Sequence, residues 1–526
     1  MPGADKGKHL HTLLEKCIHG IKSILFSRLG LIMLLLLVQL WLLICVFEWF
    51  AAFIPHLFGS SMLFNLLMVI ILLNSNTDPT AKLTWLIVIM VLPVFGALLY
   101  LYTRSDLGHR ALKRRIRTLT QETRFDLRQQ PDVVRRLETL DTGAAALTQY
   151  AARCGCHPVW ENTEVTYFTS GEDKLDALLA ELQKAKKFIF LEYFIVEEGV
   201  MWGQVLDLLV KKVKEGLEIR VLIDGTCEFT KLPHNYVDQL NSLGIKCKLF
   251  APASPFISTH YNYRDHRKIV VIDGCIGFTG GVNLADEYIN QKLLYGHWKD
   301  AAIMLKGDAV RSFTVMFLQM WAIDEPHVET GKFLKSTLPY HAASSGFVMP
   351  YADFPLDGNQ VGERVYMDIL YRAKKYVHIM TPYLILDGPM EAALKYAAER
   401  GVEVHLILPG IPDKKYAWWL AHTHYSALIA SGVKISEYTP GFVHAKVFVA
   451  DDVEAVVGTI NLDYRSLYHH FECAAYMYGT DCIGAIEHDF QDTLEKCTRM
   501  SEKRLAEFPW YQKLAGAALK ALAPLM

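Results

Sequence analysis

One short pattern of chemically capable residues occurs twice in this chain of 526 residues. Each copy reads His-x-Lys-x4-Asp-x6-Gly-[Gly/Thr]-x-Asn. In the first copy, the polar side chains are His266, Lys268, Asp273 and Asn283. In the second copy, they are His444, Lys446, Asp451 and Asn461. Every position of the second copy lies 178 residues after its counterpart (444 minus 266), so the pattern indicates a duplication.

Two such sets that face one another would suit the chemistry of a phosphodiester. Histidine has a reference pKa of about 6.5, so one imidazole can attack phosphorus and form a phosphohistidine. The other imidazole can protonate the leaving alcohol and then deprotonate the incoming one. The two lysines would neutralise the phosphate, and the two asparagines would donate hydrogen bonds to its oxygens. This two-step exchange of alcohols requires no metal and no other cofactor.

Two further carboxylates follow the motifs at similar distances and precede similar strands. They are Asp300 in HWKDAAIM and Glu472 in HHFECAAY. We expect them to fix the tautomers of the two histidines, with pairing across the two halves as one possible arrangement; the alternative is an ordinary carboxylate at a strand end. Asp273 and Asp451 lie five residues beyond their lysines, and we expect them to be structural, holding loops around the site.

The secondary-structure pattern predicts an α/β fold with a central sheet in each half. Short β-branched runs alternate with helical patterns, and AKKFIFLEYF resembles AKKYVHIMTPY further along the chain. The runs KIVVID and KVFVAD predict core strands, which would place the histidine and lysine of each motif on one face. Asn283 and Asn461 would then sit in a turn at the far end of a hairpin.

The duplication also suggests boundaries along the chain. The predicted parts are a membrane region at 1–103, a basic juxtamembrane linker at 104–164, a first repeat at 165–325, a connector at 326–358, a second repeat at 359–509 and an amphipathic tail at 510–526. Each repeat carries only one His-Lys-Asn set, so neither should be active alone. The tail is expected to pack on the catalytic unit, with a surface-bound helix as the alternative.

Three apolar segments near the N-terminus, at about 29–47, 57–73 and 83–102, predict membrane-spanning helices. Each approaches the roughly 20 residues needed to cross a bilayer. Lysines and arginines flank the first and the last segment, which would place both flanks in the cytoplasm and so require an even number of crossings. Either the middle segment is re-entrant or the N-terminus lies outside; both arrangements leave the large C-terminal part in the cytoplasm.

Composition argues against two other classes of protein. The formal net charge of −2 provides no overall positive field for nucleic acid. A zinc site at His266 or His444 is disfavoured because lysine and asparagine are poor companions for zinc and no HExxH pair occurs. The ten cysteines are scattered, and Cys154-x-Cys156 has no matching second pair.

The duplicated His-x-Lys-x4-Asp pattern resembles the signature of the phospholipase D superfamily. The stretches NYRDHRK, GGVNLADEY, GTINLDYRS and WLIVIMVLPVFGALLYLY resemble, more narrowly, bacterial cardiolipin synthases. The resemblance implies two pseudo-symmetric phospholipase D-like α/β repeats that form one catalytic unit, preceded by transmembrane helices. It also implies a multi-pass protein of the bacterial cell membrane whose catalytic region faces the cytoplasm.

The activity that the resemblance implies is transfer of a phosphatidyl group between two phosphatidylglycerol molecules, giving cardiolipin and glycerol. Phosphatidylglycerol and anionic membrane lipids would be the partners, with no nucleic acid and no metal. His266 would be the nucleophile and His444 the acid/base, although the pseudo-symmetry leaves the reverse order open. A hydrolytic phospholipase D, a membrane-bound nuclease and an inactive membrane scaffold are the alternatives, and the acceptor could be another alcohol such as phosphatidylethanolamine.

Overall fold

A computed structural model describes residues 28–58, 60–75, 77–105, 107–233, 235–252, 263–342 and 345–525. The chain forms two compact units. The first contains the described residues up to 109 together with residue 252, and the second contains the described residues of 110–251 and those from 263 onward. The basic residues Lys6, Lys8, Lys16 and Lys22 and the Asn262 of NYRDHRK lie outside the described residues.

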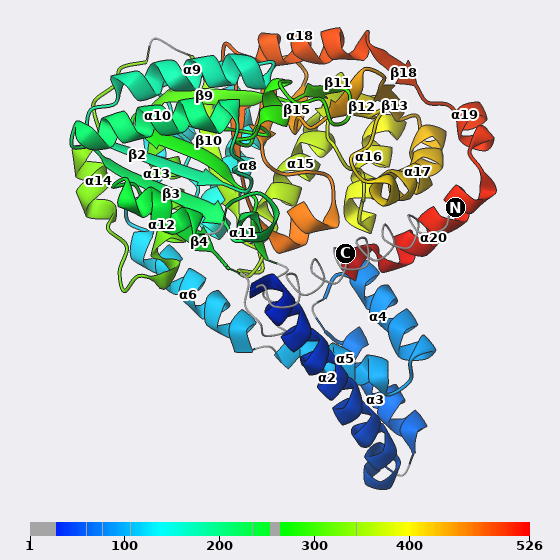
Figure 1. The fold of residues 1–526 in the computed structure, drawn as a ribbon. Coiled ribbons are helices and arrows are strands. Elements are labelled where there is room, and N and C mark those ends of the chain that lie inside the picture. Colours follow the sequence, from blue (N-terminus) through cyan, green and yellow to red (C-terminus); the bar gives the residue numbers. More distant parts are fainter. Residues whose placement is uncertain are drawn as a thin grey trace, which may run out of the picture. The chain divides into compact units, whose positions relative to one another are not determined.

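Within its described residues, the first unit contains the helices α2 to α5 (Figure 1). They are α2 (Arg28–Phe58), α3 (Ser61–Leu73), α4 (Pro79–Val91) and α5 (Phe95–Ser105). Ser60 and Asp78 cap α3 and α4 by accepting hydrogen bonds from backbone N–H groups of the first turn. Among the described helices, one is long and apolar enough to cross a membrane, with a window at Leu37–Ile54.

The expectation of three full-length spans is therefore not confirmed. The helices α3 and α4 have 13 residues each, short of the roughly 20 that a bilayer requires. The predicted segment at 83–102 is interrupted, since α4 ends at Val91 and α5 begins at Phe95. Pro93 explains the break, because proline disfavours the helical conformation of the residue before it and removes a backbone donor.

The second unit contains two sheets with matching strand orders. The first sheet runs β1 (Thr163–Phe168), β9 (Ala302–Gly307), β7 (Ile276–Gly280), β6 (Lys268–Ile272), β2 (Phe188–Tyr193), β3 (Glu218–Asp224) and β4 (Lys246–Phe250). The second runs β10 (Phe347–Asp353), β17 (His470–Tyr478), β16 (Glu454–Gly458), β15 (Val447–Ala450), β11 (Tyr376–Met380), β12 (Glu403–Pro409), β13 (Lys434–Tyr438) and β18 (Cys497–Arg499). The predicted α/β duplication is confirmed, strand for strand, apart from the added β18.

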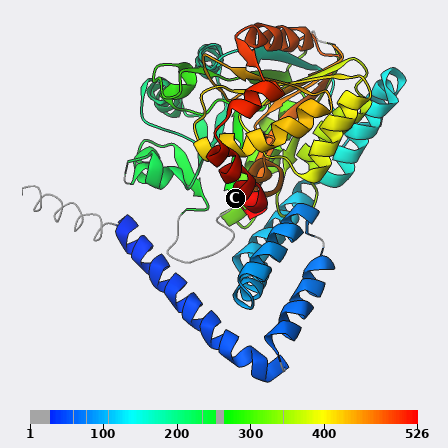
Figure 2. The ribbon, with the colours of Figure 1, turned by 90° about the vertical axis from the view of Figure 1, so that its right-hand side faces the viewer.

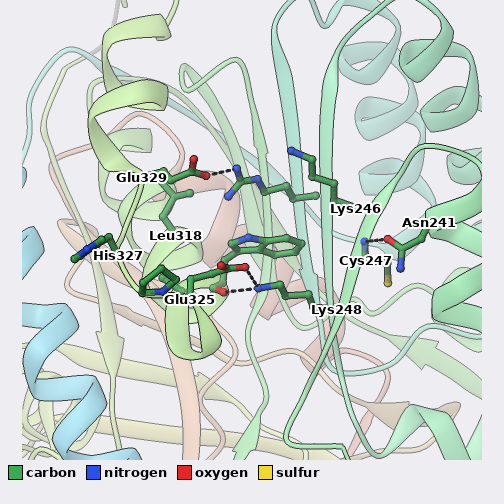
Figure 3. A pocket seen from close by; sticks show the side chains of 12 residues that line it. Asn241, Lys246, Cys247, Lys248, Leu318, Glu325, His327 and Glu329 are labelled. Atoms are coloured by element: carbon green, nitrogen blue, oxygen red, sulfur yellow. Dashed lines mark hydrogen bonds and ion pairs between the residues drawn. The ribbon is translucent and has the colours of Figure 1, made fainter.

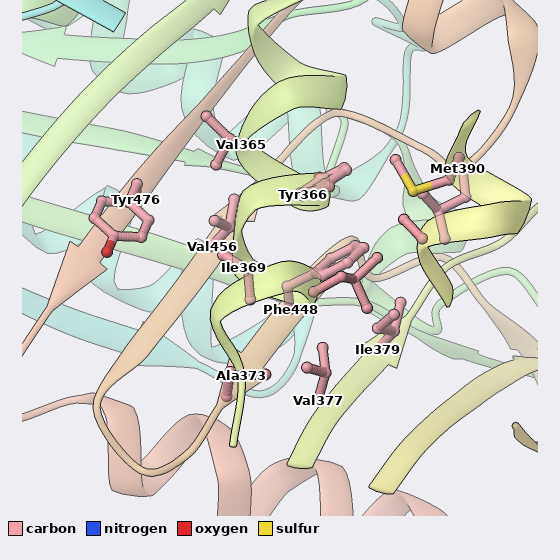
Figure 4. Close-up of a cluster of buried hydrophobic side chains, with 14 of the residues drawn as sticks. Val365, Tyr366, Ile369, Ala373, Val377, Ile379, Met390, Phe448, Val456 and Tyr476 are labelled. Carbon is pink, nitrogen blue, oxygen red and sulfur yellow. The ribbon is translucent and has the colours of Figure 1, made fainter. Parts of the chain in front are cut away.

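Helices cover the sheets on both sides (Figures 1 and 2). The outer helices of the first repeat are α9 (Gly171–Lys184), α10 (Val200–Lys214), α11 (Cys227–Thr230) and α12 (Tyr236–Ser242), and those of the second are α15 (Val361–Arg372), α16 (Gly388–Glu399) and α17 (Lys415–Ala430). A shared core joins side chains of both sheets with those of α13 (Val310–Trp321) and α18 (Ile483–Leu494). Figure 4 shows the separate outer core of the second repeat, where Tyr366 stacks on Phe448.

The segments predicted as linkers carry more structure than expected. The region 104–164 contains α6 (Leu107–Thr123), α7 (Pro131–Leu140) and α8 (Thr142–Gly155), and α7 and α8 contribute to the outer core of the second repeat. The connector 326–358 contains α14 (Thr330–Ser336) and the edge strand β10. After α19 (Glu502–Glu507), the tail forms α20 (Trp510–Leu522), the red helix leading to the label C in Figure 2, which packs on α17.

Two short ladders connect the repeats directly. The two-residue strand β5 (Arg264–Asp265) of the first repeat pairs with β17 of the second. In the reciprocal place, β14 (Gly441–Val443) of the second repeat pairs with β8 (His297–Lys299) of the first. Each ladder ends directly before or beside a motif histidine, so backbone hydrogen bonds set the relative position of the two motifs.

The motif aspartates hold the opposite ends of their strands. Asp273 accepts hydrogen bonds from the backbone N–H groups of Lys186, Lys187 and Phe188, at 2.8, 2.7 and 3.1 Å. Asp451 makes the equivalent three bonds to residues 374–376. Asp273 follows β6, which begins at Lys268, and Asp451 follows β15, which begins one residue after Lys446; neither aspartate lines the cavity that contains the histidines. The loops that they hold therefore start β2 and β11 and do not surround the site.

We predict that Asp451→Asn lowers stability without changing the chemistry. One of the two oxygens that bind backbone N–H groups is lost, which should cost about 1–3 kcal/mol of unfolding free energy. Asparagine tolerates the positive φ of 54° at this position, so backbone strain is not introduced. Thermal unfolding of the full chain in detergent provides the measurement.

Asp452→Asn is the matched control, because Asp452 also has a positive φ but is exposed, and among the described residues its carboxylate accepts from the Tyr376 hydroxyl alone. Its unfolding free energy should change by no more than about 0.5 kcal/mol. An Asp451→Asn enzyme of normal stability that had lost activity would contradict the structural role.

Candidate active site

The two motifs meet at one cavity of about 660 Å³ in the second unit. His266, His444, Asn283 and Asn461 all line it. The two lysines lie behind this surface, with exposures of 2% for Lys268 and 1% for Lys446. The duplicated residues that are 178 positions apart in sequence (444 minus 266) are thus brought to a single site.

Each histidine is bonded to the repeat to which it does not belong. His266 donates its backbone N–H to the carbonyl of Phe471, and its Nδ1 lies 2.9 and 3.0 Å from the carboxylate oxygens of Glu472. His444 donates its backbone N–H to the carbonyl of Lys299, and its Nδ1 lies 2.8 Å from Asp300 Oδ2. The two carboxylates expected to accompany the histidines therefore do contact them, in a crossed arrangement.

The lysines bind the backbone of their own motifs. Lys268 Nζ donates to the carbonyl of His266 at 2.5 Å, and Lys446 Nζ donates to the carbonyl of His444. Lys446 Nζ also lies 2.9 Å from His444 Nδ1. Each ammonium group is consequently held beside the backbone of its motif histidine, where its charge can act on an anion in the cavity.

The sequence suggested that the asparagines lie in the turn of the hairpin, but the structure places them elsewhere. The β6–β7 turn carries Asp273, while Asn283 comes after β7 and returns to the end of the hairpin where Lys268 lies, because the strands are antiparallel. Asn283 accepts from the backbone N–H of Ile195 and donates to the Tyr288 hydroxyl at 2.7 Å. Asn461 donates to Asp463, and its Oδ1 has no partner within the described residues.

Burial governs the protonation of the cationic groups. Desolvation lowers the pKa of Lys268 to about 8, against the opposing charge of Glu472, and that of Lys446 to about 7, against Asp300. Desolvation and Lys446 together lower the pKa of His444 to about 4. For His266, desolvation and the charge of Lys268 place the pKa well below its ordinary value.

The pKa values of the two carboxylates shift in opposite directions. Burial opposes ionisation of Asp300, but the charge of His444, its hydrogen bond and Lys446 outweigh burial and lower the pKa of Asp300. Burial dominates at Glu472 and raises its pKa well above the ordinary value, despite Lys268 and the hydrogen bond from Thr459. The His444–Asp300 pair therefore stabilises an imidazolium better than the His266–Glu472 pair does.

Aromatic side chains form walls around both histidines. The ring of Phe194 lies 5.0 Å from that of His266, and the rings of Tyr288 and Trp298 lie 5.4 and 5.3 Å from that of His444. Trp298 also donates its indole N–H to Asp300 Oδ2 at 3.3 Å. None of these aromatic residues belongs to the repeated pattern, which explains why the motif alone did not identify the walls.

A third imidazole, that of His470, was missed by sequence reasoning. Its ring centroid lies 5.3 Å from that of His266, and it lines the same cavity. His266, His470 and Glu472 offer ligand atoms within 4.8 Å of one another, so these three residues could hold a metal ion. The first motif has no counterpart of His470, and only its position two residues before Glu472 could have drawn attention to it.

A second cavity, of about 470 Å³, lies near Trp321 and is also lined by cationic side chains (Figure 3). Arg220 forms an ion pair with Glu329 at 2.5 Å, and Lys248 pairs with Glu325. Lys246 pairs with Glu218 at 2.9 Å. Because carboxylates already neutralise these cations, this cavity offers no comparable place for an anion.

The fold and the crossed pairs define the class: a duplicated α/β unit with one composite His-Lys site, as in phospholipase D-like proteins. A family model described as cardiolipin synthase, PLD-like domain, matches residues 178–321 and 366–494. A model described as phospholipase D-nuclease N-terminal matches residues 63–104. The chain belongs to the cardiolipin synthase family.

Individual relatives agree with that assignment. The chain is 32% identical to a cardiolipin synthase of Alkalihalophilus pseudofirmus over 489 residues, which cover 91% of this chain and 95% of that protein. It is 51% identical over 458 residues to an uncharacterized protein of Streptococcus mutans, covering 87% of this chain and 99% of that one. The crystal structure of a phosphatidylserine synthase from Haemophilus influenzae shares the fold, with a TM-score of 0.54, 15% identity and coverage of 73% and 98%.

We predict that Asp300→Asn and Glu472→Gln each lower kcat by about 10²–10⁴-fold, because an amide can leave the imidazole in the wrong tautomer. Steady-state kinetics on the full chain provide the measurement. Glu487→Gln is the matched control, since Glu487 lies 2.9 Å from His378 Nδ1 but does not line the cavity. Its kcat should stay within about threefold of the parent value. Equal losses in all three variants would mean that these carboxylates serve the fold alone.

A second prediction concerns pH. An ammonium is charged below its pKa, so kcat/KM should fall as pH rises through about 7 to 8, where Lys446 and then Lys268 lose their charges. Bound anionic substrate favours the charged forms, so the corresponding decline in kcat should lie at higher pH. Lys446→Arg should remove the decline in kcat/KM near pH 7 and leave the decline near pH 8. A kcat/KM profile that stays flat to pH 9 would be inconsistent with this assignment.

Proposed function

We propose that this chain is a membrane-anchored phosphatidyltransferase that converts two phosphatidylglycerol molecules into cardiolipin and glycerol. The observation that carries the proposal is the crossed pairing, in which two imidazoles line one cavity and each contacts a carboxylate of the other repeat. Such a pair can act on opposite sides of one phosphorus atom. The chain's membership of the cardiolipin synthase family supports the choice of lipid substrates.

In the first step, Nε2 of His266 attacks the phosphorus of one phosphatidylglycerol. A nitrogen–phosphorus bond forms, the bond from phosphorus to the glycerol headgroup oxygen breaks, and His444 gives its proton to the departing glycerol. Burial and the charge of Lys268 lower the pKa of His266 well below its ordinary value, so this ring is neutral and able to attack, whereas the contact with Asp300 helps His444 to accept a proton.

In the second step, a headgroup hydroxyl of another phosphatidylglycerol attacks the same phosphorus. His444 takes the hydroxyl proton, the nitrogen–phosphorus bond breaks, and cardiolipin leaves with His266 restored. One phosphodiester replaces another, so no nucleotide is consumed. Lys268 and Lys446 neutralise the phosphoryl oxygens, with Asn283 and Asn461 at the cavity wall as hydrogen-bonding groups.

The same proposal includes a location. The helix α2 would anchor the chain in the bacterial cell membrane through Leu37–Ile54, and the shorter apolar helices α3 and α4 would lie within the same layer. The catalytic unit would face the cytoplasm. Anchoring would place the cavity beside both lipid substrates and favour a lipid alcohol over water as the acceptor.

We predict that purified full-length enzyme added to phosphatidylglycerol vesicles produces cardiolipin and glycerol in equal amounts. His266→Ala and His444→Ala should each lower the rate by about 10³-fold or more, because both groups act in each transition state. Thin-layer or mass-spectrometric analysis of products separates the alternatives. Phosphatidic acid as the main product would instead identify a hydrolase, and unchanged cardiolipin synthesis in both variants would exclude the mechanism.

Trapping the intermediate tests the order of the histidines. Acid-labile phosphatidyl adducts survive a quench at alkaline pH, so peptide mapping after such a quench should find the adduct on His266. An adduct on His444 would reverse the two roles. Activity without an adduct on either histidine would reject the covalent route.

A further inference from the structure

The imidazole of His470 has no role in the mechanism above, yet it is placed as a ligand-binding group. It is 8% exposed and lines the cavity. Neither ring nitrogen has a hydrogen-bond partner within the described part of the chain. Its Nδ1 lies 3.7 Å from Glu472, whose carboxylate already binds His266 and Thr459. Burying a polar group without a partner is costly, so a partner from outside the chain is expected.

Apart from the nearby Glu472 carboxylate, the charged groups that act most strongly on His470 are positive. Besides burial, the charges of Arg465, His469, Lys268 and Lys414 lower its pKa. Arg465 and Lys414 both line the cavity on its exposed side. The Arg465 side chain forms no ion pair within the described residues, and Lys414 Nζ lies 3.9 Å from Asp413, which itself accepts from the Tyr383 hydroxyl at 2.6 Å. These cations are therefore available to a ligand.

We propose that His470, Lys414 and Arg465 form a second anion subsite, which binds the phosphate of the acceptor phospholipid. This inference rests on the proposed function. The reacting phosphate already has Lys268 and Lys446, and a single donor lipid brings a single phosphate.

The chemistry of the product supports the assignment to the acceptor. Cardiolipin carries two phosphates joined by a glycerol bridge, so the cavity must hold two anions when the second bond forms. His470 lies beside His266, with 5.3 Å between ring centroids, which is within reach of a phosphate one glycerol bridge away from the reacting phosphorus. Water and free glycerol have no phosphate, so the subsite would favour a phospholipid acceptor over both.

A metal ion is the competing ligand, since His266, His470 and Glu472 could coordinate one. The positive charges argue against a metal ion, because Lys268, Lys414 and Arg465 would repel a divalent cation. The same charges disfavour protonation of His470. Occupation by a metal would also draw Glu472 away from His266. All of these positive charges favour the binding of an anion.

Two reactions of the same enzyme can be compared to test whether a residue binds the acceptor's phosphate or takes part in the chemistry that both reactions share. Cardiolipin synthesis uses an acceptor with a phosphate, whereas incorporation of labelled glycerol into phosphatidylglycerol uses one without. Both reactions need the same donor, the same phosphatidyl-histidine and the same acid/base group. A group that binds only the acceptor's phosphate should affect the first reaction and leave the second.

The variants are Lys414→Gln, Arg465→Gln and His470→Leu in the full chain. Each should slow cardiolipin synthesis by roughly 10- to 100-fold, mainly through a higher KM, since each removes a hydrogen bond to a charged group. Labelled-glycerol incorporation should stay within about threefold of the parent rate. Arg465→Lys should restore part of the loss, because it keeps the charge.

Neighbouring residues provide matched controls. Lys415→Gln changes an equally exposed lysine that does not line the cavity, and His469→Leu changes a histidine that contacts the Tyr263 ring and lies outside the cavity lining. Both controls should leave the ratio of the two reactions unchanged.

Three results would overturn the inference: an equal loss of both reactions in the subsite variants, no loss in either, or a parent activity that falls on treatment with EDTA and returns with zinc. A parent enzyme that makes no cardiolipin from phosphatidylglycerol would instead reject the proposed function itself.

Discussion

The bond between each motif histidine and a carboxylate of the opposite repeat is the interaction on which the site depends. His266 contacts Glu472, and His444 contacts Asp300, so neither repeat contains a complete pair. The ladders β5–β17 and β14–β8 fix these pairs through backbone hydrogen bonds directly beside them. The positions of both imidazoles therefore depend on the packing of the two repeats, and a relative shift of the sheets would disturb both pairs together.

Burial gives the crossed pairs their chemical value. The two lysines and two histidines share a site that is largely removed from water, where their charges repel one another and desolvation lowers every pKa. A bound phosphate would relieve that repulsion, because an anion restores the stability of the charged forms. The free energy of binding is thus coupled to protonation, and groups that sit poorly ionised in the free site become effective when the substrate arrives.

The pseudo-symmetry holds for the order of the seven shared strands but not for the environment of the two histidines. Both carboxylates are fully buried, but the pKa of Asp300 is lowered and its Oδ2 also accepts the indole N–H of Trp298, whereas the pKa of Glu472 is raised and His470 Nδ1 lies 3.7 Å from its carboxylate. In the proposed mechanism, this difference would suit one ring to the role of nucleophile and the other to that of acid/base. It also places the unmatched imidazole and the exposed cations on one side of the cavity, so that the second half of the chain carries the features that the first half lacks.

The sequence by itself determined the duplication, the α/β strand pattern and the types of residue at the site, because a repeated spacing and a two-residue alternation are local properties of the chain. It also supplied the two carboxylates from their similar spacing after the motifs, although Glu472 proved to lie within β17 and not before it. The sequence placed Asn283 at the wrong end of its hairpin, because the strand boundaries and the position of the turn were not evident from the sequence. It also missed the helix break at Pro93, because the apolar run continues on both sides of the proline. Only the tertiary structure decided which carboxylate meets which histidine and brought His470 to the cavity, because partners more than a hundred residues apart are chosen by the packing of the sheets.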